Sequence, residues 1–390
     1  MLSCGEMHPR TVLFVGNFFF ALCAALITYT LLTYLSSFMP VAYTGLVIAG
    51  GALVALIVFP SLPHLVARYG AQRLALAFAT IEMIALLILA AAPGAITASI
   101  LIALAVSLQP LLSYELDLLL EATVAEEGTT GRVRALFITA WNSAALMAPL
   151  IMGALLVDSD AYGRIFLAAA AALVPFTVLF ASRRLPEGVP VKLTHMQDTL
   201  VCISRDRDFA AVTFGHFLLY SFYIWAPLYV PIYLHTVLDI PWSTLGWVFS
   251  IMLVPYVLIE YPAGWIADKM LGDKEIMFAG FIIAGGALAS LSLLSPASPI
   301  ILIVGILVLS RVGAALIESM TEGHFFRRVS EQDINSVSVF RGIWPVANLV
   351  GPLVGSVILL WGNYQLFFLL TGGFIACAGA ATTLLIKDFR

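Results

Sequence analysis

The chain alternates between long apolar runs and short polar segments. A helix needs about 20 apolar residues to cross the hydrocarbon core of a bilayer, and twelve runs of the sequence reach roughly that length. They cover residues 11–39, 41–66, 73–92, 95–122, 131–157, 163–182, 208–236, 242–267, 275–294, 299–325, 335–361 and 363–386. The pattern therefore predicts an all-α membrane protein with twelve transmembrane helices.

The longest polar break, residues 183–207, divides these helices into two sets of six. It contains Pro186 and Pro190 and carries charges of both signs, which is typical of a segment outside the membrane. We therefore expect an N-terminal six-helix half at 1–182, a cytoplasmic linker at 183–207 and a C-terminal six-helix half at 208–390.

The two predicted halves share short features in the same order. A tripeptide of glycine, a polar residue and phenylalanine recurs, as do a pair of carboxylates one helical turn apart and a Trp–Pro pair. They are Gly16–Phe18, Asp117 with Glu121 and Trp141 with Pro149 in the first half, and Gly215–Phe217, Glu318 with Glu322 and Trp344 with Pro352 in the second. Repeated halves with a binding site at their midplane are typical of secondary transporters, so we predict two pseudo-symmetric halves.

The composition excludes a soluble globular protein. Hydrophobic residues make up 61% of the chain and charged residues 11%, whereas a soluble domain has about 25% charged residues. No basic face indicates a nucleic-acid partner. The four cysteines form no CxxC pair and no metal-ligand spacing, so we expect neither a disulfide framework nor a metal site. The first ten residues are too short and too polar for a separate signal peptide.

Two loops carry a more specific pattern. Gly264–Lys269 reads GWIADK, and Pro63–Arg73 reads PHLVARYGAQR, with Pro63 and Ala67 where a glycine and an aspartate would complete the match. With its repeated halves, the chain resembles the major facilitator superfamily of secondary transporters, whose loop after the second helix of each half reads G-x-L-A-D-R-x-G-R. The resemblance covers nearly the whole chain.

The resemblance implies a role for each helix. The first, fourth, seventh and tenth helices are expected to line a central cavity, the second, fifth, eighth and eleventh to form the interface between halves, and the others to be peripheral. It also implies that the loop aspartate meets a helix N-terminus and helps to close the cytoplasmic side. The residues expected at this gate are Asp268, Lys269, Gly264, Arg68, Glu121 and Glu322.

Ionisable residues inside the apolar runs mark candidate sites, because inserting one costs about 2.5–3.5 kcal/mol. Arg311 lies near the middle of the tenth run, and Glu318 follows on the same helix face about 10.5 Å along the axis. We interpret Arg311 as a contact for an anionic substrate, or as the partner of a cavity carboxylate such as Glu115. An internal ion pair without a substrate role is the alternative, and Glu318 fits the cavity and a helix-end pair equally well.

Several weaker candidates for the cavity are polar or aromatic. They are Asn17, His216, Tyr220, Gln109 and Asn142. Asn17 and His216 occupy equivalent positions in the repeat, although a single histidine in a helix is more often a structural residue. Glu82 lies in the third run, which the resemblance makes peripheral, and the sequence gives no role for it.

Together these features predict a secondary active transporter that works by alternating access, with proton-coupled export as the first expectation. The export direction comes from Ala148–Gly153 (APLIMG), which is similar to the proline–glycine motif of drug/proton antiporters. Small residues that let helices pack explain the same motif without reference to direction. A proton-coupled or facilitative importer of a small organic anion or sugar is the alternative. A non-transporting receptor or assembly factor on the same fold is the third.

The expected partners follow from this interpretation. The sequence contains neither HExxH nor a Walker A motif, so we expect no enzyme activity, no ATP-driven transport and no cofactor. We expect a small-molecule substrate, protons as the coupling ion and a lipid bilayer as surroundings, with the protein acting as a monomer.

The positive charges fix the predicted orientation. With the N-terminus inside, 17 of the 19 Lys and Arg residues fall on the cytoplasmic side, as the positive-inside rule requires. These residues are Arg10, Arg68, Arg73, Arg132, Arg134, Arg183, Arg184, Lys192, Arg205, Arg207, Lys269, Lys274, Arg327, Arg328, Arg341, Lys387 and Arg390. Both termini are therefore expected in the cytoplasm, in a multi-pass protein of a bacterial inner membrane.

This orientation can be tested by thiol labelling. A single cysteine placed within residues 186–196, in a cysteine-free background, is expected to resist a membrane-impermeant reagent in intact cells and to react after permeabilisation. A cysteine in place of Asp239, in a loop predicted outside, is the matched control and should react in intact cells. Ready labelling of residues 186–196 in intact cells would reverse the orientation.

Overall fold

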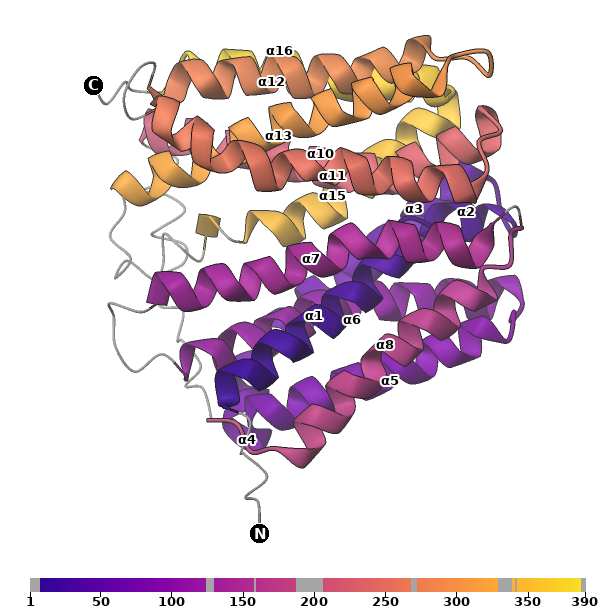
Figure 1. Cartoon of the computed structure of the whole chain (residues 1–390), viewed down its shortest axis with the longest axis vertical. Coiled ribbons are helices and arrows are strands. Elements are labelled where there is room, and N and C mark those ends of the chain that lie inside the picture. Colours follow the sequence, from indigo (N-terminus) through magenta and orange to yellow (C-terminus); the bar gives the residue numbers. More distant parts are fainter. Residues whose placement is uncertain are drawn as a thin grey trace. The chain divides into compact units, whose positions relative to one another are not determined.

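The computed structural model describes residues 8–123, 130–157, 159–186, 206–267, 272–328, 339–340 and 342–386. Within these residues every regular element is a helix (Figure 1). Eleven helical spans of this described part are long and apolar enough to cross a membrane, and α11 (Trp242–Ile266) occupies the remaining predicted run. The predicted all-α fold with twelve membrane helices is confirmed.

The first compact unit contains the described residues of Met1–Met39, Gly50–Lys192 and Pro241–Trp247. Its helices are α1 (Pro9–Thr28), α2 (Leu31–Ser36), the second half of α3 (Val41–Val58), the short 3-10 helix η1 (Phe59–Ser61), α4 (Leu62–Tyr69), α5 (Ala71–Ala90), α6 (Ala95–Glu121), α7 (Thr130–Leu156) and α8 (Gly163–Ser182). Within it, α1 packs against α7 and α8, and α5 packs against α6 and α8. The first predicted run is thus two helices, α1 and α2, separated at Tyr29–Thr30.

The second compact unit contains the described residues of Pro40–Ala49, Leu193–Ile240 and Val248–Arg390. Its helices are α10 (Arg207–Ile232), the short π-helix η3 (Tyr233–Val237), most of α11, α12 (Asp273–Ser290), the 3-10 helix η5 (Leu291–Leu293), α13 (Ile300–Arg328), α15 (Ile343–Trp361) and α16 (Tyr364–Thr383). Here α12 packs against α13 and α16, while α10 packs against α13, α15 and α16. The predicted halves 1–182 and 208–390 and their linker stay a prediction, because most of the linker lies outside the described residues.

A glycine with positive φ precedes the third long helix of each predicted half. Gly70 has φ 84° and is the N-cap of α5, and Gly272 has φ 90° and is the N-cap of α12. Side chains with a Cβ rarely adopt this conformation. The two turns therefore share the same backbone conformation, a glycine N-cap with positive φ. Both belong to the loops that carry the repeated sequence motif.

The start of α11 belongs to the first unit because it packs closely on α7. A Cβ at Gly246 would lie 2.7 Å from the carbonyl oxygen of Pro149 and 2.9 Å from the Cα of Gly153. Trp242 Nε1 also donates to Asp160 Oδ1 at 3.2 Å. Small residues let two membrane helices approach this closely, so the Ala148–Gly153 motif has a packing role in the structure.

The same Asp160 carboxylate accepts a hydrogen bond from the Tyr162 hydroxyl at 2.9 Å. Burial, reinforced by this carboxylate, raises the pKa of Tyr162. Tyr162 therefore remains a neutral donor near neutral pH, and Asp160 links the turn before α8 to the start of α11.

In the second unit, the start of α3 packs on α15 in the same way as the start of α11 packs on α7 in the first unit. A Cβ at Gly45 would lie 2.6 Å from the carbonyl oxygen of Pro352 and 2.5 Å from Ser356 Oγ. Pro352 is the residue that repeats Pro149 in the sequence. Both copies of the repeated proline thus offer their carbonyl to a glycine near the start of another helix, which explains in packing terms why the pair recurs.

The close contact at Gly246 predicts opposite effects for two alanine substitutions. Gly246→Ala should destabilise the protein by about 1–3 kcal/mol, because the added methyl overpacks a backbone contact. Gly286→Ala is the matched control in α12, where an added Cβ meets nothing within 4 Å; alanine should stabilise that helix by up to about 1 kcal/mol. Melting temperatures of the purified variants measure both, and equal melting temperatures would contradict the contact.

Candidate functional site

Arg311 is a buried cation near the middle of α13. Its side chain is 2% exposed, and the guanidinium carbon lies 4.9 Å from the centre of the Phe222 ring on α10. Arg311 Nη1 has no hydrogen-bond partner among the described residues. A cation–π contact contributes about 2 kcal/mol when it is desolvated, which is less than the cost of burying an unpaired charge. Arg311 Nη1 is therefore a buried donor with no acceptor among the described residues.

A row of tyrosines and one carboxylate lies beside this part of α10 and α13. The Tyr223 hydroxyl donates to Glu318 Oε2 at 2.5 Å. The Tyr223 ring lies 6.0 Å from that of Tyr220 and 5.9 Å from that of Tyr256, both edge to face. Glu318 is thus bound to a tyrosine two turns beyond Arg311, and its carboxylate does not neutralise that cation.

His216 of α10 makes one polar contact with α13 and stacks on Phe340, which follows α13 in the chain. Its Nδ1 lies 3.4 Å from Thr321 Oγ1, and its ring stacks on Phe340 at 3.9 Å and meets the edge of Tyr220 at 4.5 Å. Because the Thr321 hydroxyl donates to the Ile317 carbonyl at 2.8 Å, His216 Nδ1 is assigned as the donor. The side chain is 2% exposed, so these contacts enclose it within the protein.

The predicted cavity residues of the first unit divide into a paired and an unpaired set. Asn17 Nδ2 donates to the Phe137 carbonyl at 2.8 Å and so ties α1 to α7. Glu115 is fully buried, and neither of its oxygens has a hydrogen-bond partner in the described part of the chain; the same is true of Gln109 Nε2. Asn142 is exposed on α7. Only Glu115 and Gln109 therefore have polar atoms that are buried and still lack a partner.

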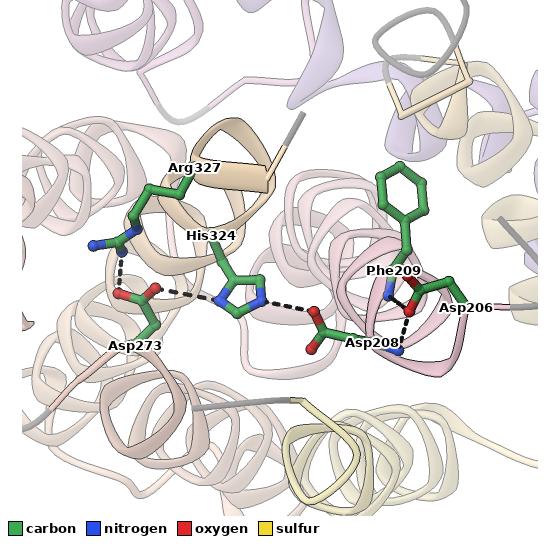
Figure 2. Close-up of polar contacts among 6 residues, drawn as sticks. All are labelled: Asp206, Asp208, Phe209, Asp273, His324 and Arg327. Atoms are coloured by element: carbon green, nitrogen blue, oxygen red, sulfur yellow. Dashed lines mark hydrogen bonds and ion pairs between the residues drawn. The ribbon is translucent and has the colours of Figure 1, made fainter. Parts of the chain in front are cut away.

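A third group, which the sequence did not reveal, lies where α10, α12 and α13 meet (Figure 2). His324 is 2% exposed, with Nε2 3.2 Å from Asp208 Oδ2 and Nδ1 3.3 Å from Asp273 Oδ2. Arg327 forms an ion pair with the other oxygen of Asp273. Since ionised carboxylates only accept hydrogen bonds, this arrangement requires a proton on both ring nitrogens. We call these four residues the His324 cluster.

The sequence contains a separate indication for each residue of the His324 cluster, namely the charge that each helix end prefers. Asp208 and Asp273 lie in the first turns of α10 and α12, where the helix dipole favours negative charge. His324 and Arg327 lie near the end of α13, where it favours positive charge. Asp206 adds the N-cap of α10, accepting from the backbone N–H groups of Asp208 and Phe209 (Figure 2). Helix-end preferences predict each residue, but not that they meet.

With the fold and these side chains described, comparison with known proteins becomes informative. Residues 212–388 match the family model of the Major Facilitator Superfamily. Over this stretch the chain resembles that superfamily. This match and the long apolar helices support a multi-pass membrane transporter. No curated protein matches the chain by sequence.

Solved transporter structures share the superfamily fold over almost the whole chain. The nucleoside transporter NupG is 16% identical with a TM-score of 0.78, covering 98% of this chain and 100% of that one. A bacterial homolog of the human lysosomal transporter Spinster, in an inward-facing and occupied conformation, is 11% identical with a TM-score of 0.72, covering 98% and 95%. A POT family transporter in complex with a thioalcohol-conjugated peptide is 14% identical with a TM-score of 0.72, covering 96% and 94%. At these identities the likeness establishes the fold.

The residues that the resemblance places at a cytoplasmic gate are only partly described. Asp268 and Lys269 lie outside the described residues, and of Gly264 the structure gives only its place in α11. Arg68 is exposed at the end of α4, with its guanidinium carbon 5.3 Å from the centre of the Tyr69 ring. Glu121 and Glu322 are exposed near the ends of α6 and α13. The gate remains a prediction.

The His324 cluster predicts a large difference between two neighbouring substitutions. His324→Gln should destabilise the protein by about 3–5 kcal/mol, because two buried carboxylates lose the cation between them. Arg327→Gln is the control, since Arg327 is 45% exposed and an exposed charge contributes about 0–1 kcal/mol. Thermal unfolding of the purified variants measures the difference. Similar melting temperatures would contradict the central position of His324.

Proposed function

We propose that this transporter works by alternating access, moves a small organic anion and couples that movement to protons. The observation that carries the proposal is the buried Arg311 with its unpartnered Nη1. A buried charge without a partner is costly, so a ligand that supplies the missing acceptor binds with a large gain. The chemistry of that acceptor defines the substrate class.

The guanidinium of Arg311 selects for a planar anionic group. It stays charged at any working pH and offers a fork of donors that matches a carboxylate or a phosphate. Phe222 lies against the guanidinium, so the ring holds the charge while the unpartnered nitrogen remains available. The tyrosines of α10 supply aromatic surface for an apolar substrate body. A small carboxylate or phosphate ester with an apolar or planar body fits this chemistry.

The proton side of the proposal is supported by carboxyl groups of the first unit. Glu82 and Glu115 are both fully buried, and no oxygen of either has a hydrogen-bond partner within the described residues. A carboxyl in such surroundings is far less costly when it is neutral. Groups that bind a proton in one conformation and release it in another are the chemical requirement for coupling.

We keep export as the proposed direction. Its support is the likeness of Ala148–Gly153 to the motif of drug/proton antiporters, although the same residues also have the packing role described above. Proton-coupled or facilitative import of a small organic anion or sugar is the alternative. Proteoliposomes loaded with radiolabelled anion, with an imposed pH gradient of either sign, distinguish them. Gradient-driven efflux supports export, gradient-driven uptake supports import, and equal rates without a gradient support facilitation.

Substitution of Arg311 tests the anion site directly. Lactate, succinate, benzoate and inorganic phosphate serve as probes, and a bound anion should raise the melting temperature of the wild-type protein. In Arg311→Lys the affinity should fall about tenfold, or about 1.4 kcal/mol, because lysine keeps the charge but loses the fork. Arg311→Ala should remain folded and lose the shift.

The Arg311 experiment has a matched control and two outcomes that would contradict the binding role. Arg164→Lys alters an exposed arginine of α8 and should leave the ligand shifts unchanged. If Arg311 instead has a purely structural role, Arg311→Ala lowers the melting temperature without ligand. A stable Arg311→Ala protein with wild-type affinity and transport rules out the binding role.

A further inference from the structure

Glu82 occupies a position that its helix did not lead us to expect. It lies near the middle of the 20-residue helix α5, the third apolar run, which the resemblance made peripheral. Instead of facing lipid, its side chain is 0% exposed. Both carboxyl oxygens are buried and have no hydrogen-bond partner among the described residues. Protein therefore encloses this acid on every side.

Two polar side chains from neighbouring helices are close to this carboxyl. Gln109 on α6 and the free thiol of Cys23 on α1 lie within range of electrostatic interaction with Glu82. Gln109 Nε2 is itself buried without a partner. The donor and the acceptor are thus near each other but not hydrogen-bonded.

The helices α4 and α8, which also pack against α5, bring no charge to Glu82. On α4 the titratable groups are His64, Arg68 and Tyr69, and all three are exposed. On α8 the charged residue is Arg164 at the helix start, where Nη1 donates to the Leu155 carbonyl at 3.0 Å. Neither helix supplies a cation that could stabilise an ionised Glu82.

The titratable groups on α6 and α1 are also distant from Glu82 or uncharged. Besides Cys23 they are Arg10, Tyr29, Tyr114, Glu115, Asp117 and Glu121. Glu115 is six residues beyond Gln109, about 9 Å along the helix axis, and Arg10 donates to the Thr123 carbonyl at the end of α6. Gln109 is a side chain that can donate a hydrogen bond to the carboxyl. Among the described residues, Glu82 therefore has a polar side chain nearby but no counter-ion.

An acid in these surroundings is stable in its neutral form, because an isolated carboxylate in an apolar interior is very costly. We propose that Glu82 is the proton-binding site of the transporter, holding the coupling proton in one conformation and releasing it in another. This inference rests on the proton coupling proposed above and adds the residue at which the proton binds. On release the O–H bond of Glu82 breaks, the proton passes to water, and the negative charge stays on the carboxylate.

The surrounding helices provide a means of linking this proton to a conformational change. Pro110 lies inside α6 directly after Gln109, and proline removes one backbone hydrogen bond and permits a bend. A bend there brings Gln109 Nε2 onto the carboxylate once Glu82 has lost its proton. On α1, Cys23 lies one to two turns before the break at Tyr29–Thr30. The proton at Glu82 therefore acts on two helices that the superfamily resemblance places along the cavity.

Infrared spectroscopy of the purified protein in lipid nanodiscs tests the proposal with the proton itself as probe. A protonated carboxyl gives a C=O band separate from those of carboxylates, and Glu82→Gln identifies the band of Glu82. This band should be present at neutral pH, shift in D2O and vanish on alkaline titration. Gln109→Leu should move its disappearance to higher pH, because the ionised form loses its donor. Glu115→Gln and Cys23→Ala are spectral controls that should leave the band in place.

Hydrogen–deuterium exchange then tests whether the proton governs conformation. At alkaline pD, wild-type protein should show altered protection of α1, α5 and α6 relative to neutral pD, after correction for intrinsic exchange. Glu82→Gln mimics the protonated acid and should keep the neutral pattern at both values. If Glu82→Gln fails to fold, the band is assigned by its displacement in Gln109→Leu, and the exchange comparison uses that variant, whose change should occur at higher pD.

Several results would overturn the proposal. They are a Glu82 band missing at neutral pH, a band that neither exchanges nor titrates, and exchange patterns that respond to pD equally in wild type and Glu82→Gln. None of these measurements requires a substrate. A failure here therefore leaves the anion site at Arg311 standing, and a failure of the Arg311 experiments leaves the result for Glu82 intact.

Discussion

The constraint on which this structure depends is that the hydrocarbon of a bilayer offers no hydrogen bonds. Every buried polar group must find its partner within the protein, and most of the described side chains do. Trp225 Nε1 donates to the Gly351 carbonyl at 2.8 Å, and the Tyr233 hydroxyl donates to the carbonyls of Leu291 and Leu294 at 3.1 Å each. The first bond joins α10 to α15, and the other two join η3 to η5 and to the residue after it, so satisfying the constraint also fixes how the helices pack.

The same constraint separates structural polar groups from functional ones. The His324 cluster places opposite charges together with both ring nitrogens in use, and its removal should cost stability before it costs transport. Arg311, Glu82 and Glu115 have buried atoms without a partner in the described part of the chain. A group left in this state favours whatever supplies the missing charge or hydrogen bond, and an anion and a proton are the ligands that we propose for these three residues.

Hydropathy predicted the helices well because it measures the property that the membrane selects. The twelve predicted runs agree with the observed spans, apart from short breaks such as the one between α1 and α2. Side-chain partners were not predictable in this way. Asn17 was a cavity candidate, but its amide bonds to Phe137. Asp208, Asp273 and His324 are far apart in the sequence, and Glu82 shows that hydropathy does not tell which face of an apolar helix the protein covers.

The internal repeat relates the positions of Arg311 and Gln109 in the two predicted halves. At the offset that relates Asp117 to Glu318, Arg311 corresponds to Pro110, the residue directly after Gln109. The fourth helix of each predicted half thus has a polar feature at the same depth, but the side chains differ. The second half places a permanent cation there, whereas the first half places an amide near a buried acid. In the proposed mechanism the duplicated fold thus divides the work of coupled transport: the second half binds the substrate charge and the first half holds the proton.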